Sequence, residues 1–446
     1  MIAERAVLEC FYGPLWSGSD RARVLEVARA AGATDYVYGP AADERTGGRW
    51  REPYAADEEA LQDLNARAAS LGVRTTWRVS PGAPLDPARG VECSSIEDQR
   101  LLRERIRDAA ALGFSRVLVA FDDVSAALSP ADRAAFGHDP HPLAAAHATM
   151  LNLAARAAEE HGLSFLVCPM HYWGVTPSAY RRRLADLLHT DVPVCWTGPG
   201  VTSRTISARD AADVAEQWAR PLWLWDNYPV NDWDGITRSF DNDTAPRRLP
   251  LRALRGRDAA LAGVLAGYGT NAALDPLVTL PATVTALRWA ADPAAYEPDG
   301  ALAEAAIMLG LDPEAIAVLA ELCGAAPVDE APGAIMALIA STMAAPSRAE
   351  HARQDLGQLA LALEGLRDDP GFGSWVAAAR GQLDAATFAL GVLVGEEAHD
   401  GRLAASARAL RAEPRAVAHG AMTTLVDWVL GMMGAPAPQH PDELDG

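Results

Sequence analysis

The sequence alternates eight short β-rich runs with stretches of helical period along its first two thirds. Repeated alternation of strand and helix predicts parallel strands joined by crossover helices. Eight such units can close into a (β/α)8 TIM barrel, which needs about 250 residues. We therefore predict an α/β barrel over 1–297, with strands at 6–11, 35–38, 74–79, 116–121, 164–169, 193–197, 222–225 and 262–266.

A segment rich in Pro, Asp and Gly, ADPAAYEPDG, ends this alternation at 291–300. Beyond it the β-branched runs disappear, and small and apolar residues recur with helical period, as in GQLALALEGL. This pattern predicts an all-α helical domain over 298–435, made of packed antiparallel helices. Such a domain could also support a homo-oligomer. The final residues, 436–446, are predicted to form a disordered tail.

Charge and composition exclude several classes of partner and chemistry. A formal net charge of −20 argues against binding to nucleic acid or to an anionic membrane. The chain contains no lysine, which excludes covalent chemistry on a lysine amine. Its five cysteines are widely spaced, and its N-terminus lacks the features of a signal peptide. We therefore expect a cytoplasmic protein with no metal site and no cofactor.

Polar and aromatic residues gather at six of the predicted strand ends, where catalytic groups of such barrels lie. The sharpest signal is FDDV, in which Asp122 and Asp123 follow the fourth strand. Two adjacent carboxylates repel one another unless one is protonated or hydrogen-bonded. Such a pair can divide its roles, so that one group orients the substrate while the other donates a proton. The alternative is that an Asp at this point caps the next helix.

A second cluster follows the seventh strand in LWDNYPVND, which contains Trp225, Asn227 and Asp232. An aromatic wall beside carboxylate and amide groups suits a sugar, which has both an apolar C–H face and vicinal hydroxyls. Tyr172 follows the fifth strand in CPMHYWG, and its hydroxyl can donate to an oxygen atom in the same mouth. An ordinary Asx-rich turn is the alternative for the polar residues after Trp225.

Several ordered motifs together resemble glycoside hydrolase family 84, the bacterial hyaluronidase-like and O-GlcNAcase β-N-acetylglucosaminidases. These motifs are ECFYGPLW, YVYGPAADERTGGRWREPY, SPG, FDDV, CPMHYWG, WTGPG and LWDNYPVND, and they span nearly all of the barrel. The resemblance implies a retaining hydrolase for a β-linked 2-acetamido sugar, either a small molecule or a glycoconjugate. It also implies substrate-assisted catalysis, in which the acetamide oxygen is the nucleophile and an oxazoline forms.

The resemblance assigns a role to each matching residue. Asp122 would orient and polarise the acetamide N–H, and Asp123 would act as the general acid and then as the base. Tyr172 would hydrogen-bond the acetamide oxygen. The other matching positions, which would contact the substrate or form the wall behind its methyl group, are Tyr12, Gly13, Trp225, Asn227 and Asp232.

The sequence also departs from the family pattern at the mouth. Cys10 stands where the family has a glycine, and Ala41 replaces a sugar-binding lysine. Gly267 and Tyr268 stand in place of an Asn-Pro pair near the eighth strand, so that a hydroxyl contact is lost unless Asn271 supplies it. Losing one partner in a buried polar site costs about 1–3 kcal/mol, so these changes predict an altered N-acyl substrate.

Two other functions remain open from the sequence. A cyclase or transferase could use the same acid and amide-polarising groups without hydrolysis, because fold alone does not fix the reaction. A non-catalytic protein that binds an amino sugar would explain the missing sugar contacts. It would not explain why the paired carboxylates are kept together with Tyr172 and Asn227.

Overall fold

A computed structural model of the chain describes residues 1–54, 58–82, 90–189, 192–232, 248–324, 333–413, 415, 417 and 420–433. The chain forms two compact units. The first comprises Met1–Asp232 and Leu254–Glu297, and the second comprises Trp233–Ala253 and Pro298–Gly446. The tail predicted over 436–446 lies outside the described residues.

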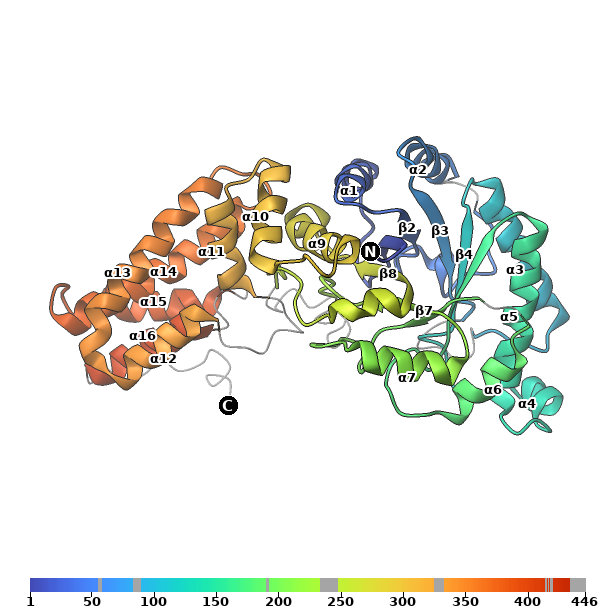
Figure 1. The fold of residues 1–446 in the computed structure, drawn as a ribbon. Helices are drawn as coiled ribbons and strands as arrows, with labels where there is room; N and C mark the ends of the chain where they lie inside the picture. Colours follow the sequence, from blue (N-terminus) through green and yellow to red (C-terminus); the bar gives the residue numbers. More distant parts are fainter. Residues whose placement is uncertain are drawn as a thin grey trace. The chain divides into compact units, whose positions relative to one another are not determined.

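Eight parallel strands close into a barrel in the first unit, which confirms the predicted (β/α)8 fold (Figure 1). Because β1 pairs with both β2 and β8, the sheet has no free edge. All eight carboxyl ends therefore open on one face. The strands are β1 (Glu4–Glu9), β2 (Asp35–Tyr38), β3 (Arg74–Val79), β4 (Arg116–Ala120), β5 (Ser164–Cys168), β6 (Val194–Trp196), β7 (Leu222–Asp226) and β8 (Leu265–Asn271).

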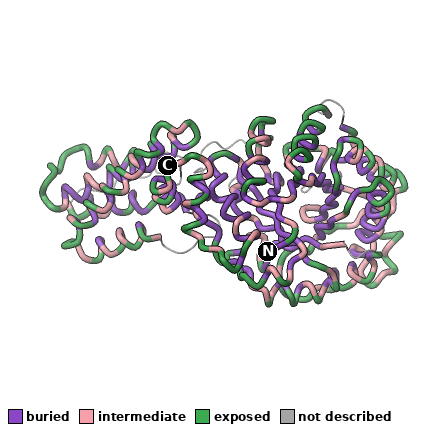
Figure 2. The backbone as a smooth tube through the Cα atoms, turned by 45° about the horizontal axis from the view of Figure 1, so that its top comes forward, coloured by how far each residue is buried: buried purple, intermediate pink, exposed green. Residues whose placement is uncertain are grey.

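Helices join the strands and cover the outside of the barrel (Figure 1). They are α1 (Gly18–Ala30), α2 (Glu58–Ser70), α3 (Ile96–Ala111), α4 (Pro130–Phe136), α5 (Pro142–Glu160), α6 (Ala179–Leu187), α7 (Ala208–Trp218) and α9 (Pro276–Ala291). Serine side chains cap several of these helices, as Ser17 does for α1 by accepting from the Asp20 N–H. Figure 2 shows buried residues along the strands and exposed ones on the outer helix surfaces.

Alternate strand residues point into the barrel and fill it with apolar side chains. The core cluster consists of Ala6, Leu8, Val37, Leu118, Ala120, Leu166, Cys168, Cys195, Trp223 and Trp225. Because the period is two residues, the next inward positions beyond β1, β4 and β7 lie at the open mouth. Those positions are occupied by Cys10, Asp122 and Asn227.

The predicted position of the eighth strand, 262–266, is wrong, because β8 spans Leu265–Asn271. Glycines are common in turns and weaken the strand pattern in the sequence, but Gly267 and Gly269 are needed here for packing inside the barrel. A Cβ on Gly269 would lie 2.3 Å from the ring of Trp223, and one on Gly267 would lie 2.1 Å from its indole nitrogen. The two glycines therefore make room for this indole inside the barrel.

The shift of the eighth strand corrects a second expectation. Gly267 pairs with Glu4 at the start of β1, so it lies at the opposite end of the barrel from the mouth. Tyr268 is fully buried and donates its hydroxyl hydrogen to Asp226 at 3.1 Å. These two residues therefore do not mark a lost substrate contact, whereas Asn271, the last residue of β8, reaches the mouth.

The described helices of the second unit are α10 (Pro298–Leu309), α11 (Pro313–Cys323), α12 (Ala334–Ala344), α13 (Ala349–Ala362), α14 (Gly373–Val394), α15 (Gly401–Ala412) and α16 (Ala421–Met432). The segment 248–253, which the sequence pattern assigned to the barrel, packs with this unit. The Leu251 N–H donates to the Gly324 carbonyl at 3.0 Å, and Arg252 pairs with Glu321 at 3.0 Å. Contacts this distant in sequence leave no local pattern to read.

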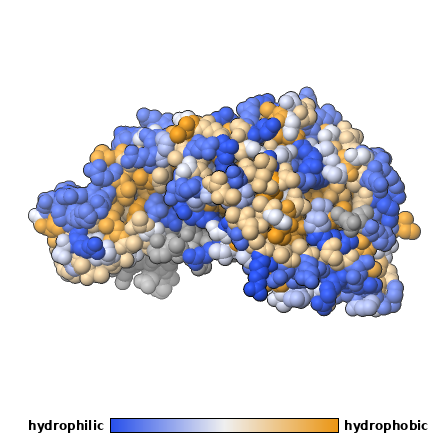
Figure 3. Space-filling view, viewed as in Figure 1, coloured by the Kyte–Doolittle hydropathy of each residue, from blue (hydrophilic) through white to orange (hydrophobic). Residues whose placement is uncertain are grey.

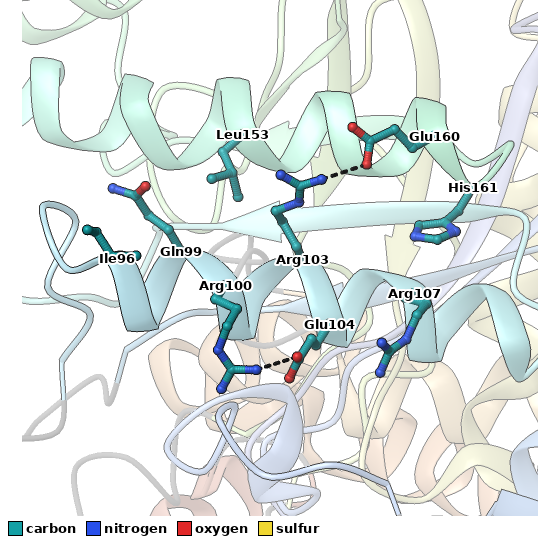
Figure 4. Close-up of a pocket in the computed structure, with 9 residues that line it drawn as sticks. All are labelled: Ile96, Gln99, Arg100, Arg103, Glu104, Arg107, Leu153, Glu160 and His161. Carbon is teal, nitrogen blue, oxygen red and sulfur yellow. Dashed lines mark hydrogen bonds and ion pairs between the residues drawn. The ribbon is translucent and has the colours of Figure 1, made fainter.

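The outer surface mixes hydrophilic and apolar residues on the face in Figure 3. A hollow of about 410 Å³ lies between α3 and α5 on the outside of the barrel, away from the strand ends (Figure 4). Its arginines are ion-paired, as Arg103 is with Glu160 at 2.9 Å. Across the described ranges, no helix is long and apolar enough to cross a membrane.

Adding one methyl group to the eighth strand tests the packing around Trp223. Gly269→Ala should lower the free energy of unfolding by about 1–3 kcal/mol, because the new Cβ meets a ring that cannot move aside in a filled barrel. Gly263→Ala is the control, since a Cβ there meets nothing within 4 Å. Denaturant unfolding of both variants measures the difference. Equal stability of the two would contradict the packing account.

Candidate active site

Tyr12 joins three strand ends at the mouth of the barrel. Its hydroxyl donates to Asp123 Oδ2 at 2.5 Å, which connects the end of β1 with the end of β4. Its backbone N–H donates to Asp232 Oδ2 at 2.8 Å, which adds the loop after β7. The structure thus brings together two of the predicted carboxylates through a residue that the sequence placed only as a substrate contact.

Asp122 forms an ion pair that the sequence did not predict. Arg78 is a residue of β3, and its Nη2 atom donates to Asp122 Oδ1 at 3.0 Å and to Asp122 Oδ2 at 2.9 Å. Both side chains are largely buried, with exposed fractions of 10% for Arg78 and 13% for Asp122. Adjacent carboxyl groups therefore meet different partners, a cation for Asp122 and a phenol for Asp123.

Burial and neighbouring charge alter the acidity of two carboxyl groups in the mouth. Burial, together with the neighbouring charge of Asp122, raises the pKa of Asp123 to about 6, although the Tyr12 hydroxyl and the Arg78 charge oppose that rise. Burial also raises the pKa of Asp232 to about 6, although the Tyr12 N–H opposes that rise. A buried carboxyl group with a pKa near 6 can donate and accept a proton near neutral pH.

The amides of Asn227 and Asn271 belong to one hydrogen-bond network. Asn227 Oδ1 accepts from Trp225 Nε1 at 3.0 Å and from Asn271 Nδ2 at 2.9 Å. Asn227 Nδ2 donates to the Val201 carbonyl at 2.8 Å. Asn271 Oδ1 is buried and has no donor among the residues that the structure describes.

Cys10 and Tyr172 pack against the barrel core from the mouth side. Burial raises the pKa of the Cys10 thiol, so this sulfur stays protonated and is a poor nucleophile at neutral pH. Burial together with the charges of Asp123 and Asp122 raises the pKa of Tyr172. Its hydroxyl therefore keeps its proton and can donate it in a hydrogen bond.

Arg181 holds the loop that carries Tyr172. This residue of α6 is 1% exposed, and its guanidinium donates to the backbone carbonyls of His171, Trp173 and Gly174. It also contacts the side chain of Gln217 at 3.1 Å. A cation surrounded by carbonyl oxygens fixes the backbone on both sides of Tyr172.

Two of the predicted substrate contacts, Gly13 and Ala41, have no polar side chain. Gly13 lies beneath Leu274, because a Cβ there would be 2.2 Å from the Leu274 Cδ2 atom. Ala41 is half-buried beyond β2, and its N–H donates to the Phe11 carbonyl at 3.1 Å. Their contacts with substrate stay predictions, as do the substrate roles of the other mouth residues.

The sequence pattern did not predict the roles of Arg78 and Arg181 at the barrel mouth. Arg78 lies beside Leu118 in the β3–β4 register and so takes an inward position, which a charged residue rarely occupies. That position was a usable signal once the strand was placed. Arg181 belongs to the run RRR at 181–183, and the sequence does not show which of the three is buried.

Comparisons with known proteins identify the family to which the chain is similar. A family model described as NAGidase, beta-N-acetylglucosaminidase, matches residues 5–322. The chain is 27% identical over 272 residues to Protein O-GlcNAcase of Rattus norvegicus and to that of Mus musculus. These alignments cover 59% of this chain and 27% of each relative, so the chain spans about a quarter of their length.

The fold is also found among solved structures. A mutant of the O-GlcNAc hydrolase from Thermobaculum terrenum matches with a TM-score of 0.82 and 23% identity. The match covers 99% of this chain and 98% of that one. At this identity the likeness shows the fold, and the chemistry depends on the residues at the mouth.

Removing the charge of Asp123 should stabilise the protein above its pKa. The folded state holds this proton up to about pH 6, whereas the ordinary value is 3.8, so the wild type loses stability as the pH rises between these values. Asp123→Asn avoids that loss. At pH 8 it should be more stable than the wild type by about 1–3 kcal/mol, and at pH 3 the difference should vanish. Denaturant unfolding across this range, with the exposed Asp63→Asn as control, measures the effect.

Arg181→Met should loosen the loop around Tyr172 without unfolding the barrel. The Gly174 N–H donates to the Gly198 carbonyl at 2.9 Å, so its hydrogen-exchange rate reports on the loop. We expect at least about tenfold faster exchange, because a cost of about 1.4 kcal/mol changes an equilibrium tenfold. The exposed neighbour Arg182→Met is the control. Unchanged exchange at Gly174 in Arg181→Met would show that the carbonyl contacts do not hold the loop.

Proposed function

Because the chain belongs to the beta-N-acetylglucosaminidase family, glycoside hydrolase family 84, we propose that it hydrolyses a β-linked 2-acetamido sugar or a related N-acyl amino sugar with retention of configuration. The observation that carries the proposal is the contrast between two adjacent carboxyl groups. Asp122 pairs with a cation, whereas Asp123 accepts from Tyr12 and has a pKa of about 6. Such a contrast separates an ionised partner from a proton donor.

In the first step, Asp123 gives its proton to the glycosidic oxygen as the bond from that oxygen to C1 breaks. The acetamide oxygen of the substrate forms the new bond to C1, and an oxazoline results. The positive charge that develops on the acetamide nitrogen faces the Asp122 carboxylate, which accepts its N–H. A fixed anion at that point stabilises the transition state more than the ground state.

In the second step, the Asp123 carboxylate takes a proton from water. The water oxygen bonds to C1 on the face that the leaving group vacated, and the bond between C1 and the acetamide oxygen breaks. Asp123 regains its proton and the acetamide is restored. Two displacements at C1 leave the configuration unchanged, as in other substrate-assisted glycosidases.

The side chains at the mouth suit a nucleophile supplied by the substrate. The Cys10 thiol keeps its proton, and the Asp122 carboxylate is engaged by Arg78. Tyr172 retains its hydroxyl hydrogen and can donate to the acetamide oxygen, which orients that atom toward C1. These features support the proposal without requiring an enzyme-bound intermediate.

The remaining mouth residues support binding of an amino sugar. Trp225 offers an indole wall, and Asn271 Oδ1 is an acceptor without a donor among the described residues. Asp232 offers a carboxyl group beside Tyr12. Cys10 and Ala41 stand where the family has glycine and lysine, so we propose that the acyl group or ring substituents differ from those of ordinary N-acetylglucosamine.

Aryl β-N-acetylglucosaminides with leaving groups of different acidity test the two carboxylates separately. Asp123→Asn should lower kcat/KM by about 10²–10⁴-fold on a poor leaving group and much less on a dinitrophenolate, which needs no proton. Asp122→Asn should lower it on both, because the acetamide loses its partner. An equal loss on both substrates in Asp123→Asn would contradict its role as the acid.

Fluorination of the N-acetyl group tests the nucleophile. Each added fluorine makes the acetamide oxygen less basic, so kcat/KM should fall steadily from acetyl to trifluoroacetyl if this oxygen attacks C1. Leaving-group chemistry is the same along the series, which makes each compound a control for the next. A rate that is independent of fluorination would favour an enzyme nucleophile instead.

A further inference from the structure

Arg78 lies across the floor of the mouth. Its position in the β3–β4 register places the side chain inside the barrel, one layer below the strand ends. A Cβ on Gly39 would lie 2.5 Å from Arg78 Cβ and 2.8 Å from its Cδ, so the glycine directly after β2 makes room for the arginine stem. The guanidinium carbon lies 5.8 Å from the centroid of the Trp225 ring on β7.

The Arg78 guanidinium forms hydrogen bonds with one acid of the pair, Asp122. Arg78 Nη2 donates to both carboxylate oxygens of Asp122, whereas Arg78 forms no hydrogen bond with Asp123 in the described part of the mouth. Arg78 Nη1 lies 3.5 Å from the Gly39 carbonyl oxygen. Arg78 Nε is buried and has no acceptor among the described residues. A buried cation that contacts one of two neighbouring acids stabilises the anionic form of that acid more than that of the other.

The charged and titratable groups around this pair follow four strands, β1, β4, β5 and β7. Arg78 faces Asp122 and Asp123 after β4, together with Cys10 and Tyr12 after β1. Asp123 in turn faces Asp122, Arg78 and Tyr12, with Tyr172 after β5 and Asp232 after β7 also close enough to interact. In the described part of the mouth, Arg78 is the one cation among these groups.

We propose that Arg78 is a positioning residue for the reaction, which keeps Asp122 ionised and thereby leaves the exchangeable proton of the acid pair on Asp123 before any ligand arrives. The inference rests on the proposed function for its chemical meaning. Arg78 itself neither gives nor takes a proton. Without its charge, the two carboxyl groups would share one proton, and a fraction of the molecules would carry it on the wrong acid.

The ion pair also sets the strength of the contact with the acetamide. Asp122 has oxygen lone pairs in addition to those that face Arg78, so it can accept the N–H of the acetamide while paired. The cation lowers the tendency of Asp122 to take that proton away completely. The nitrogen then keeps its hydrogen while positive charge develops, and the oxazoline remains an activated electrophile for the incoming water.

Carbon-13 NMR of protein labelled at aspartate Cγ follows each carboxyl group separately and needs no turnover. In the wild type we expect the midpoint near pH 6 to belong to the Asp123 signal alone. In Arg78→Met the two signals should titrate together, with a midpoint raised by about 1–3 units, because the cation no longer favours either anion. Arg78→Lys, which keeps the charge, should behave nearly as the wild type.

Two further variants keep the test decisive. Arg78→Gln removes the charge but keeps a donor for Asp122, and it replaces Arg78→Met if that protein does not fold. Arg257→Met is the matched control, since Arg257 forms a buried pair with Asp226 at 2.5 Å that does not contact the acid pair. It should lower stability and leave both titrations in place.

Kinetics then connect the titration with the reaction. Arg78→Met should lower kcat/KM at pH 6 by at least about tenfold and shift both limbs of the pH profile to higher pH. Arg257→Met should leave the shape of the pH profile unchanged. If the Asp122 and Asp123 signals of both neutral variants titrate as in the wild type, the inference is wrong, whatever the activity. If the titrations change as expected but no substrate is turned over by the wild type, the proposed function fails and the assignment of the proton stands.

Discussion

In the described part of the barrel mouth, the three largely buried carboxyl groups Asp122, Asp123 and Asp232 lie around one cation, Arg78. Burial and repulsion between neighbouring negative charges raise the pKa of Asp123 and of Asp232 to about 6, so each of these two groups exchanges its proton near that pH. The ion pair with Asp122, and the Tyr12 contacts with Asp123 and Asp232, give the three carboxyl groups different partners. The proposed division of roles between Asp122 and Asp123 rests on this uneven placement of one positive charge among several acids.

The barrel geometry makes this arrangement attainable. Residues that are 111 and 220 positions apart in the chain become hydrogen-bond partners because parallel strands deliver their carboxyl ends to one rim. The strands below are rigid and filled with side chains, while the loops above take their shape from specific contacts such as those of Arg181. Chemical precision at the mouth thus depends on both the packed barrel and a few buried donors that hold its loops.

The sequence predicted the barrel, seven of its strand positions and the paired acids, because periodicity and clustered polar residues are local signals. It misplaced β8, since the glycines around Tyr268 serve the Trp223 ring on a neighbouring strand rather than a turn. It missed Arg78 for a similar reason. A charged residue within a strand is normally predicted to be exposed. Only the strand register shows that Arg78 faces inward beside Leu118. Properties that depend on a partner far away in the chain could not be read from either position alone.

The fit of the Trp223 indole against Gly267 and Gly269 has an evolutionary consequence. Neither side of this contact can change size by itself, because each vacated or added methyl group leaves a void or a clash in a filled interior. Lineages that enlarge residue 269 are expected to shrink residue 223, so the two positions should covary among homologues. Cys10 packs against the barrel core only from the mouth side, so its size is not tied to one facing residue in this way.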